Sequence, residues 1–222
     1  MSVAFFDLDR TLIDCNSGRL WLQHEWRLGN VSLRQGAWAT WWLAKYSVGL
    51  GDGLADVFDT LARSLEGLEE RELDDRIRVW FAQEVAGRLR PGAEMALRHH
   101  RERGDRLVVA TSSSPYAGRC AQEAFGLDEV LSSVFGVDET GRFTGRMTET
   151  AVGGGKARLA ARWASEQGMS LADATFYSDS ATDLALLEAV GRPVAVNPDR
   201  ALRREAARRG WPIVDWGAVG RV

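Results

Sequence analysis

The first dozen residues constrain the fold of this chain more than any other stretch. Val3–Phe6 is a short, continuous apolar run, which is the pattern of a strand buried on both faces of a parallel sheet. Asp7 and Asp9 follow directly, and Thr11 closes the motif. Because ligands bind beyond the carboxyl ends of the strands in open α/β sheets, both carboxylates are predicted to point into the ligand crevice. Side chains alternate along a strand, so Leu8 should turn back to the core.

The close spacing of these two carboxylates favours a cation site. Two such groups repel each other unless a cation or a shared proton relieves them. Mg2+ suits the position, because this hard ion takes one or two carboxylates together with water and substrate phosphate. The structural alternative is a strand that runs into an Asp-rich turn, since Asp favours turns for its own reasons. The pair alone leaves both interpretations open.

Length and composition narrow the class of protein. A chain of 222 residues suits one domain, or a core domain with one inserted module. Its formal net charge of −3 argues against a protein that binds nucleic acid through the phosphate backbone. No apolar run approaches the roughly 20 residues that span a bilayer, and no basic segment with a cleavage site opens the chain. Cys15 and Cys120 are isolated, as expected of reduced thiols in a cytoplasmic protein.

A block of predicted helices follows the first motif, between residues 16 and 85. Asn16 or Ser17 is predicted to start its first helix, and breaks are expected at glycines further on. Aromatic stripes at helical spacing usually belong to the core, although a few could line a pocket that faces the two aspartates. The block is therefore predicted to be a compact helical module inserted after the first strand. Five of the nine tryptophans lie between residues 21 and 42 of this block: Trp21, Trp26, Trp38, Trp41 and Trp42.

A hydroxyl-rich motif follows the second predicted strand. Leu107–Ala110 is another buried apolar run, and it ends in Thr111-Ser112-Ser113-Ser114 before Pro115. Hydroxyl groups and backbone N–H groups at the start of a helix can bind phosphate. Simple capping of the helix by Ser114 is the alternative, and this fragment does not exclude it.

The middle of the chain adds a strand, a hairpin and a lysine. Val130–Val137 is predicted to form a strand, and a turn after it leads into a hairpin that includes residues 142–147. Gly153-Gly154-Gly155-Lys156 then opens a helix, but it lacks the spacing and the hydroxyl residue of a Walker A loop. Taken alone, Lys156 is predicted to be either solvated or directed at an anion, and an exposed lysine is the more common case.

A second pair of aspartates follows the strand predicted over Ala174–Tyr177. Asp179 falls at the strand end, and Asp183 falls in the first turns of the next helix. Acidic residues at a helix N-terminus are an ordinary structural feature, so this pair too is ambiguous by itself. Further strands are predicted over Arg192–Pro198 and Trp211–Val214, with a basic surface helix over Arg200–Arg209 between them.

All of these motifs fall at the carboxyl ends of successive predicted strands in a βαβ series. In this order they resemble the haloacid dehalogenase (HAD) superfamily of aspartyl-phosphate phosphatases, and within it subfamily IB, which includes phosphoserine phosphatase. The resemblance spans nearly the whole chain, including the stretch from Asn197-Pro198-Asp199 to Gly210-Trp211-Pro212. It implies a Rossmann-like parallel sheet flanked by helices. Residues 1–15 and 86–222 would form the catalytic core, and residues 16–85 a small all-helical cap of the C1 type.

The resemblance also implies roles for the four aspartates. Asp7 would be the nucleophile that takes the phosphoryl group, and Asp9 the general acid that protonates the leaving group and later activates water. The cofactor would be Mg2+, bound by the Asp7 side chain, the Asp9 backbone carbonyl and Asp179, with Asp183 supporting that shell. The expected reaction is hydrolysis of a small phosphomonoester through an aspartyl-phosphate intermediate.

The remaining motif residues would bind the phosphoryl group. Thr111 and the backbone N–H of Ser112 would hold its oxygens, and Lys156 would link the nucleophile to the phosphoryl charge. These roles agree with the chemistry, because a carboxylate is a weak nucleophile toward an anionic phosphate unless cations screen the repulsion. Phosphoryl transfer otherwise requires mainly positioning and charge stabilisation.

Three positions bear on substrate choice and on the family pattern. Ser178 replaces a glycine that the family commonly has before its last motif. Asn16 stands where phosphoserine phosphatases carry the glutamate that binds the substrate ammonium group, which argues against phosphoserine as substrate. Arg63 is the candidate for their substrate-carboxylate arginine. The tryptophan-rich cap favours a leaving group with an apolar or aromatic face.

Two other functions are compatible with the nucleophile. A phosphotransferase or mutase would keep Asp7 and Asp9 but protect the phosphoaspartate from water. A receiver-like signalling domain would be phosphorylated without being a catalyst. Receivers require neither the acid/base group Asp9 nor an inserted cap, so the sequence argues against the second alternative.

Overall fold

The computed structural model describes residues 2–30 and 54–219. At its centre is a six-stranded sheet in which all neighbouring strands are parallel. β1 (Val3–Phe6) lies between β2 (Arg106–Ala110) and β6 (Thr175–Ser178), and all four residues of β1 are buried, as its apolar run predicted. The strand order is β3 (Glu129–Leu131), β2 (Arg106–Ala110), β1 (Val3–Phe6), β6 (Thr175–Ser178), β7 (Arg192–Val196) and β8 (Ile213–Val214).

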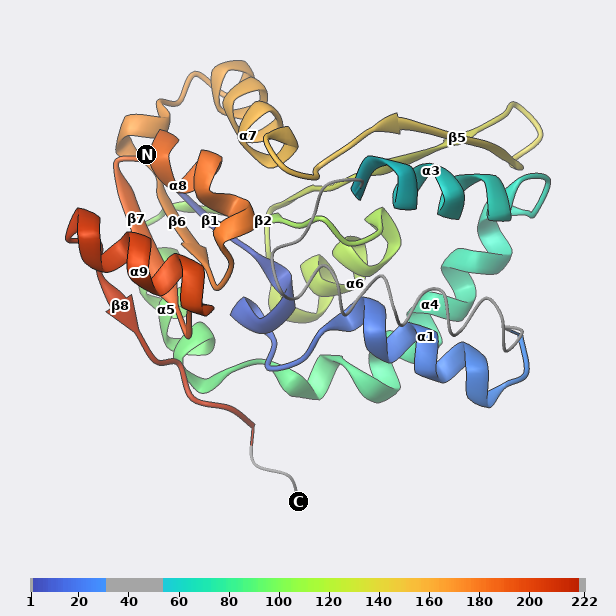
Figure 1. The fold of residues 1–222 in the computed structure, drawn as a ribbon, viewed down its shortest axis with the longest axis horizontal. Helices are drawn as coiled ribbons and strands as arrows, with labels where there is room; N and C mark the ends of the chain where they lie inside the picture. Colours follow the sequence, from blue (N-terminus) through green and yellow to red (C-terminus); the bar gives the residue numbers. More distant parts are fainter. Residues whose placement is uncertain (1, 31–53, 220–222) are drawn as a thin grey trace.

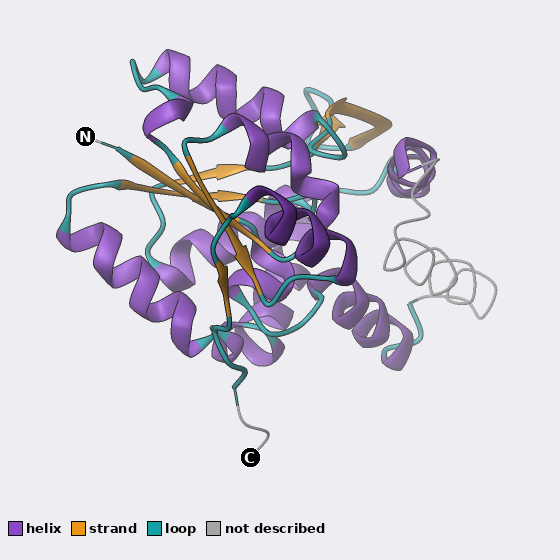
Figure 2. Ribbon diagram, turned by 60° about the vertical axis from the view of Figure 1, so that its left-hand side comes forward, coloured by secondary structure: helices purple, strands orange, loops and turns teal. Residues whose placement is uncertain are grey.

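Helices cover both faces of this sheet (Figures 1 and 2). Phe6 belongs to an apolar cluster with the helices of one face, and its neighbour Phe5 to a second cluster with the helices of the other. The predicted α/β fold with a parallel sheet is therefore confirmed. The first face carries α5 (Pro91–Glu102) and α6 (Pro115–Phe125), and the second carries α7 (Gly155–Glu166), α8 (Leu184–Ala189) and α9 (Arg200–Arg209).

The last two strands are shorter than the sequence predicted. β7 ends at Val196, because Asn197 adopts a left-handed backbone with φ of +42°. β8 contains only Ile213 and Val214, and the residue before it, Pro212, has no N–H to donate to a strand ladder.

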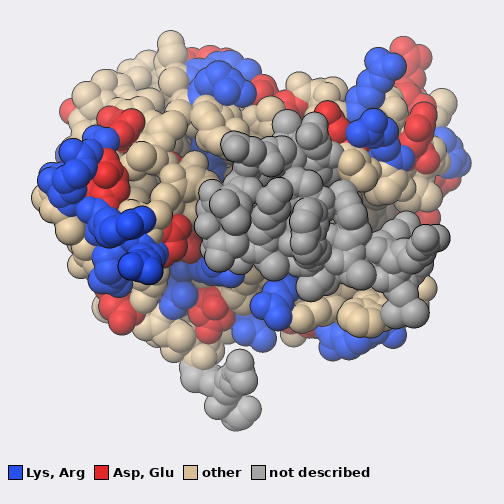
Figure 3. Space-filling model, in the orientation of Figure 1, with Lys and Arg blue, Asp and Glu red and all other residues tan. Residues whose placement is uncertain are grey.

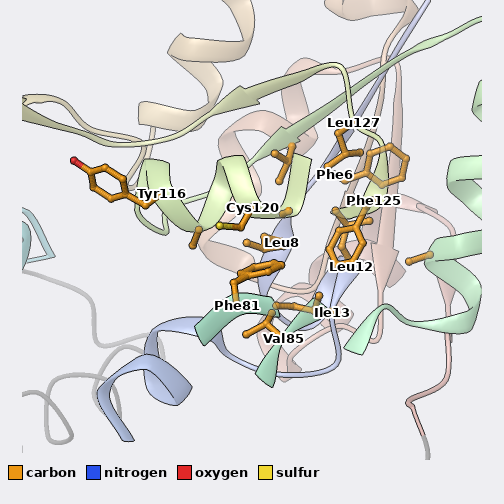
Figure 4. Packing of buried hydrophobic residues seen from close by; sticks show 14 of the residues in the cluster. Phe6, Leu8, Leu12, Ile13, Phe81, Val85, Tyr116, Cys120, Phe125 and Leu127 are labelled. Atoms are coloured by element: carbon orange, nitrogen blue, oxygen red, sulfur yellow. The ribbon is translucent and has the colours of Figure 1, made fainter. Parts of the chain in front are cut away.

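A tight helical turn, Leu8–Leu12, connects β1 to the helical block. Leu8, Leu12 and Ile13 are fully buried, and they pack with Phe81 and Val85 (Figure 4). The prediction that Leu8 turns to the core is confirmed. This packing fixes the chain immediately after Asp7, which limits how far the carboxylates of the first motif can move.

The helical block contains α1 (Ser17–Arg27), α3 (Leu54–Leu65) and α4 (Glu70–Glu84) among the described residues. Trp21 is half-buried and contacts Trp80 edge to face, with 5.2 Å between ring centroids. Trp26 is 54% exposed, so the core prediction is wrong for this residue. It lies on the outer side of α1, where it lines a surface hollow with Arg27 and Glu84. Trp38, Trp41 and Trp42 lie outside the described residues.

The prediction of a single strand over Val130–Val137 is wrong. The segment forms two strands that belong to different sheets, because the chain leaves the main sheet at Ser132 and Ser133. The Ser133 hydroxyl accepts a hydrogen bond from the backbone N–H of Ala151 at 3.0 Å, which holds this exit in place. The second strand, β4 (Val134–Val137), pairs with β5 (Phe143–Glu149) in the antiparallel hairpin that the sequence predicted.

This hairpin extends away from the main sheet and runs beside α3 (Figure 1). The backbone N–H of Gly67 donates to the carbonyl of Phe143 at 2.9 Å, and the N–H of Phe143 donates to the carbonyl of Leu68 at 3.0 Å. Residues outside the predicted cap thus pack against it. The division into a core of residues 1–15 and 86–222 and a cap of residues 16–85 stays a prediction.

The surface carries both signs of charge (Figure 3). Basic side chains gather on α9, where Arg208 and Arg209 form ion pairs with Glu205. The basic stretch is therefore a solvated helix face, as predicted. Within residues 2–30 and 54–219, none of the helices has the length and apolar character that crossing a membrane requires.

Candidate active site

The candidate site lies at the carboxyl ends of β1, β2 and β6, which are neighbours in the sheet. The backbone N–H of Asp7 donates to the carbonyl of Tyr177 at 2.9 Å, which continues the β1–β6 ladder by one residue. The chain then turns sharply, because Arg10 adopts φ of +59°. The Arg10 carbonyl accepts a hydrogen bond from Nε of Arg90 at 3.1 Å. Asp7 is thus held by pairing with β6 on one side and, on the other, by a turn that the hydrogen bond from Arg90 stabilises.

Lys156 joins the first and last motifs. Its Nζ lies 2.5 Å from Oδ1 of Asp7 and 2.8 Å from Oδ2 of Asp183. All three side chains are buried, with Lys156 only 3% exposed. The Ser178 hydroxyl donates to the same Asp183 oxygen at 2.7 Å. Residues separated by up to 176 positions along the chain are therefore brought to one polar cluster, as the motif order predicted.

The interpretation of Lys156 as an exposed lysine is wrong, and the start of α7 explains why. A Cβ atom on Gly155 would lie 2.2 Å from the backbone oxygen of Thr150, so only glycine allows this close approach. α7 begins at Gly155, and Lys156 is its second residue. A cation near a helix N-terminus opposes the helix dipole. The buried carboxylates of Asp7 and Asp183 offset that cost.

Burial dominates the electrostatics of the carboxylates. It raises the pKa of Asp7 to about 7, against the lowering effect of Lys156, and the Asp183 and Asp9 carboxylates raise it further. Burial also raises the pKa of Asp179 well above its ordinary value, and the charges of Asp7 and Asp183 add to this effect. Among the described residues, Lys156 and the exposed Arg10 are the cations whose charges act on the four carboxylates of Asp7, Asp9, Asp179 and Asp183. The chemistry of the cluster therefore favours a further cation.

Asp9 connects the core to the helical block. Its Oδ1 accepts a hydrogen bond from the backbone N–H of Ser17, the first residue of α1, at 2.5 Å. Burial raises the pKa of Asp9, and the hydrogen bonds from Ser17 oppose that shift. The hydroxyls of Ser17 and Ser113 are 3.2 Å apart. Ser17 therefore lies between the first motif and the hydroxyl-rich motif after β2.

That hydroxyl-rich motif serves two purposes. Thr111 is buried, and its Oγ1 accepts a hydrogen bond from the backbone N–H of Ser113 at 3.0 Å. The Ser112 hydroxyl donates to the carbonyl of Ala151 at 3.2 Å. Ser114 caps α6 by accepting from the backbone N–H of Ala117. The capping interpretation is therefore confirmed for Ser114, while Thr111 and Ser112 lie at the strand end where phosphate is expected.

Each of the two candidate substrate-binding residues of the predicted cap forms a hydrogen bond with the helix that it caps or lies in. Asn16 is the N-cap of α1, because its Oδ1 accepts from the backbone N–H of Arg19 at 2.8 Å. Arg63 is exposed, and its Nε donates to the carbonyl of Asp59 in the same helix at 3.2 Å. A role for either residue in substrate binding stays a prediction.

The sequence did not assign functional roles to Ser17 or Asp199. Ser17 was expected only to start a helix, and Asp199 belonged only to the resemblance near the end of the chain. An Asp directly before a predicted helix is an N-cap signal, and Asp199 does cap α9. Its contacts with the loop after β6 depend on the fold, and no local pattern indicates them.

The fold and this constellation define the class of the protein. A parallel sheet whose strand ends bring together aspartates, hydroxyls and a buried lysine is an architecture found in phosphatases that act on phosphorylated small molecules. The model of the haloacid dehalogenase-like hydrolase family matches residues 4–188, and the chain belongs to this family.

Two curated relatives extend over nearly all of the chain. One is the "Inhibition of morphological differentiation protein" of Streptomyces azureus, 34% identical over 97% of this chain and 78% of that protein. The other is a histidinol-phosphatase of Neisseria meningitidis, 30% identical over 97% of this chain and 99% of that protein.

Solved structures agree with this assignment. A protein of unknown function from Bordetella pertussis has a TM-score of 0.83 at 27% identity, covering 97% of this chain and 99% of that one. A phosphoserine phosphatase, solved as a phospho-aspartyl intermediate analogue, has a TM-score of 0.70 at 17% identity, covering 97% and 93%. The chain is a phosphatase of the haloacid dehalogenase family, and it is similar to phosphoserine phosphatase in fold.

Proposed function

We propose that the chain is a Mg2+-dependent phosphomonoester hydrolase that forms a phosphoaspartate on Asp7. The observation that carries this proposal is the buried contact of Lys156 with both Asp7 and Asp183. A lysine in that position would hold Asp7 in place and would attract the phosphoryl group to it. A cytoplasmic location, expected from the isolated thiols Cys15 and Cys120, is part of the proposal.

The reaction would proceed in two displacements. In the first, an oxygen of Asp7 attacks phosphorus, the bond to the leaving-group oxygen breaks, and Asp9 gives that oxygen its proton. In the second, Asp9 takes a proton from a water molecule whose oxygen attacks the phosphorus, and this step releases phosphate and restores Asp7. Thr111, the Ser112 backbone and Lys156 would stabilise the phosphoryl oxygens.

The acidic cluster fits Mg2+ by its donor chemistry. Asp7 and Asp179 would hold the ion with their side chains and Asp9 with its backbone carbonyl, while Asp183 would support this shell. Among the described residues, no group of three or more His, Cys, Asp or Glu side chains is arranged so that it could hold a metal ion. Mg2+ keeps several waters and binds through one or two carboxylates and substrate phosphate, so the proposal requires only the Asp7 and Asp179 side chains as ligands. The ion would offset the repulsion between the Asp7 carboxylate and the phosphoryl group.

A histidinol-phosphatase among the relatives supports a substrate larger than phosphoserine. Its product alcohol carries an imidazole ring, and α1 of the helical block carries the aromatic residues Trp21 and His24. These two rings stack, with centroids 5.7 Å apart. We therefore propose that the substrate is a small phosphorylated alcohol whose leaving group is partly apolar or aromatic.

The test is phosphate release from a panel of phosphomonoesters by purified protein with and without Mg2+. The panel includes histidinol phosphate, phosphoserine and p-nitrophenyl phosphate. We expect hydrolysis that requires Mg2+ and disappears in Asp7→Asn. Asp9→Asn should still form some phosphoenzyme from the activated aryl ester, whose leaving group requires little protonation. Full turnover in excess chelator, or by Asp7→Asn, would contradict the proposal.

A further inference from the structure

Asp199 makes three contacts with the loop that carries the last pair of motif aspartates. Its backbone N–H donates to the carbonyl of Asp179 at 2.8 Å. Its Oδ2 accepts from the backbone N–H of Ala181 at 3.1 Å and lies 3.3 Å from the hydroxyl of Ser180. Asp199 lies directly before α9, about 20 positions further along the chain than the loop residues that it contacts. Two separate segments are thus joined beside the candidate metal ligands.

This loop requires external support for an electrostatic reason. Asp179 and Asp183 are buried beside the Asp7 carboxylate, and like charges at close range repel each other strongly where water is excluded. Lys156 contacts Asp7 and Asp183, and the Ser178 hydroxyl supports Asp183 from within the loop. The contacts with Asp199 act on the other part of the loop, around Asp179.

The turn that carries Asp199 is itself fixed. Asn197, at φ of +42°, donates its N–H to the carbonyl of Val214 at 2.8 Å and accepts from the N–H of Trp216 at 3.0 Å. The second carboxylate oxygen of Asp199 caps α9 by accepting from the backbone N–H of Leu202 at 2.7 Å. One carboxylate therefore ties the loop to a rigid helix terminus.

We propose that Asp199 is a positioning residue that holds the Asp179–Asp183 loop in the arrangement in which it binds Mg2+. The inference rests on the proposed function, because it requires that Mg2+ binds at Asp7 and Asp179. Asp199 touches neither the reacting atoms nor the ion. Its loss should weaken metal binding while leaving the catalytic groups intact.

The experiment measures Mg2+ affinity without substrate, by titration calorimetry and by the rise in Tm on adding Mg2+. Asp199→Asn keeps the size of the side chain but replaces one acceptor oxygen with an amide that faces hydrogen-bond donors. Asp199→Ser keeps a capping oxygen for α9 and the backbone contact with Asp179, but it removes the carboxylate contacts with Ser180 and Ala181. Groups that orient metal ligands typically contribute about 10- to 100-fold to affinity, so we expect both variants to bind Mg2+ about 10-fold more weakly. Turnover at saturating Mg2+ should recover to near the wild-type rate.

The control is Ser170→Ala, which removes another capping side chain, the acceptor for the Ala172 N–H at 3.2 Å. It should leave Mg2+ affinity unchanged. Wild-type affinity in both Asp199 variants would overturn the inference and leave the proposed function intact. Wild-type protein that binds no Mg2+ would overturn both.

Discussion

The backbone N–H of Ser17 donates a hydrogen bond to Oδ1 of Asp9 at 2.5 Å. Ser17 is the first residue of α1, where backbone N–H groups have no partner within the helix. The proposed general acid therefore satisfies one of these groups, and the helical block orients its carboxylate. The Ser17 hydroxyl also hydrogen-bonds to Asp9, and both hydrogen bonds favour the charged form of this carboxylate.

Replacing Ser17 by proline removes that N–H at little structural cost. Proline is favoured at the first helical position, and Asn16 already has the extended backbone that precedes proline, with φ of −101° and ψ of 110°. A hydrogen bond to a charged group contributes about 1.5–3 kcal/mol, so kcat/KM for an alkyl phosphate, which reports the first displacement, should fall by roughly one to two decades. The kcat/KM for p-nitrophenyl phosphate should fall much less, because its leaving group requires little protonation.

Ser17→Ala is the matched comparison, because it keeps the N–H and removes only the hydroxyl contact with Asp9. It should change the dependence of rate on the leaving group less than Ser17→Pro, which removes both contacts. Equal losses for the alkyl and aryl esters in Ser17→Pro would mean that Ser17 supports the fold and not the acid.

The contrast between Gly154 and Gly155 gives a second prediction. A Cβ on Gly155 would meet the backbone oxygen of Thr150 at 2.2 Å, whereas one on Gly154 would meet only the end of Arg158 at 3.8 Å. Gly155→Ala should displace the start of α7 and with it Lys156. We expect a lower Tm and a loss of phosphatase activity of at least about tenfold, since one misplaced charge-stabilising group typically costs more than that. Gly154→Ala should keep both properties, and similar behaviour of the two variants would contradict this reasoning.

The sequence predicted the elements whose signal is local. Val3–Phe6 and Leu107–Ala110 are buried strands because continuous apolar runs suit a sheet covered on both faces. The positions of the motif residues could be predicted as well, because each motif directly follows such an apolar run and parallel strands end at the same edge of the sheet. Lys156 could not be placed from its own surroundings, because the carboxylates that bury it come from distant segments. The exit from the main sheet at Ser133 depends on its contact with Ala151, which no local pattern indicates.

A buried histidine behind the nucleophile strand predicts a pH dependence of stability. Nδ1 of His100 lies 2.8 Å from Asp105 Oδ2, and its Nε2 lies 2.9 Å from the hydroxyl of Tyr177. Burial lowers the pKa of His100 below its usual 6.5, against the effect of Asp105, and the charges of His99 and Arg103 lower it further. The neutral ring can donate to Asp105 and accept from Tyr177, so both of its nitrogens are used.

The sign of the effect follows from proton binding. Below pH 6.5 the unfolded chain protonates this histidine first, so the free energy of unfolding should fall as the pH decreases from 6.5 toward the lower folded pKa. Urea unfolding between pH 5 and pH 8 measures this slope. His100→Gln should be less stable than wild type at pH 8, where the wild-type contacts are intact, and its slope below pH 6.5 should be shallower. An unchanged slope would assign the pH dependence to other groups.

The last prediction concerns substrate choice and rests on Asn16. The Asn16 amide caps α1 through the N–H of Arg19 and carries no charge that could pair with a substrate ammonium group. An ammonium without such a partner in a desolvated site loses a hydrogen bond of about 1.5–3 kcal/mol, or roughly one to two decades in kcat/KM. We therefore expect phosphoserine to be a poor substrate compared with phosphomonoesters that have a larger, partly apolar leaving group.

The capping contact decides which variant tests this expectation. Glutamate is a poor N-cap, so Asn16→Glu would change both the charge and the start of α1. Asn16→Asp keeps the capping oxygen and adds a carboxylate, and Asn16→Ser keeps a capping oxygen without the charge. If Asn16 faces the substrate, Asn16→Asp should raise kcat/KM for phosphoserine relative to bulkier esters that carry no ammonium group, such as p-nitrophenyl phosphate, and Asn16→Ser should not. Histidinol phosphate carries an ammonium group too, so its kcat/KM should rise with that of phosphoserine. A wild-type preference for phosphoserine would mean that another group binds the ammonium and that the tryptophans of the cap have no part in substrate choice.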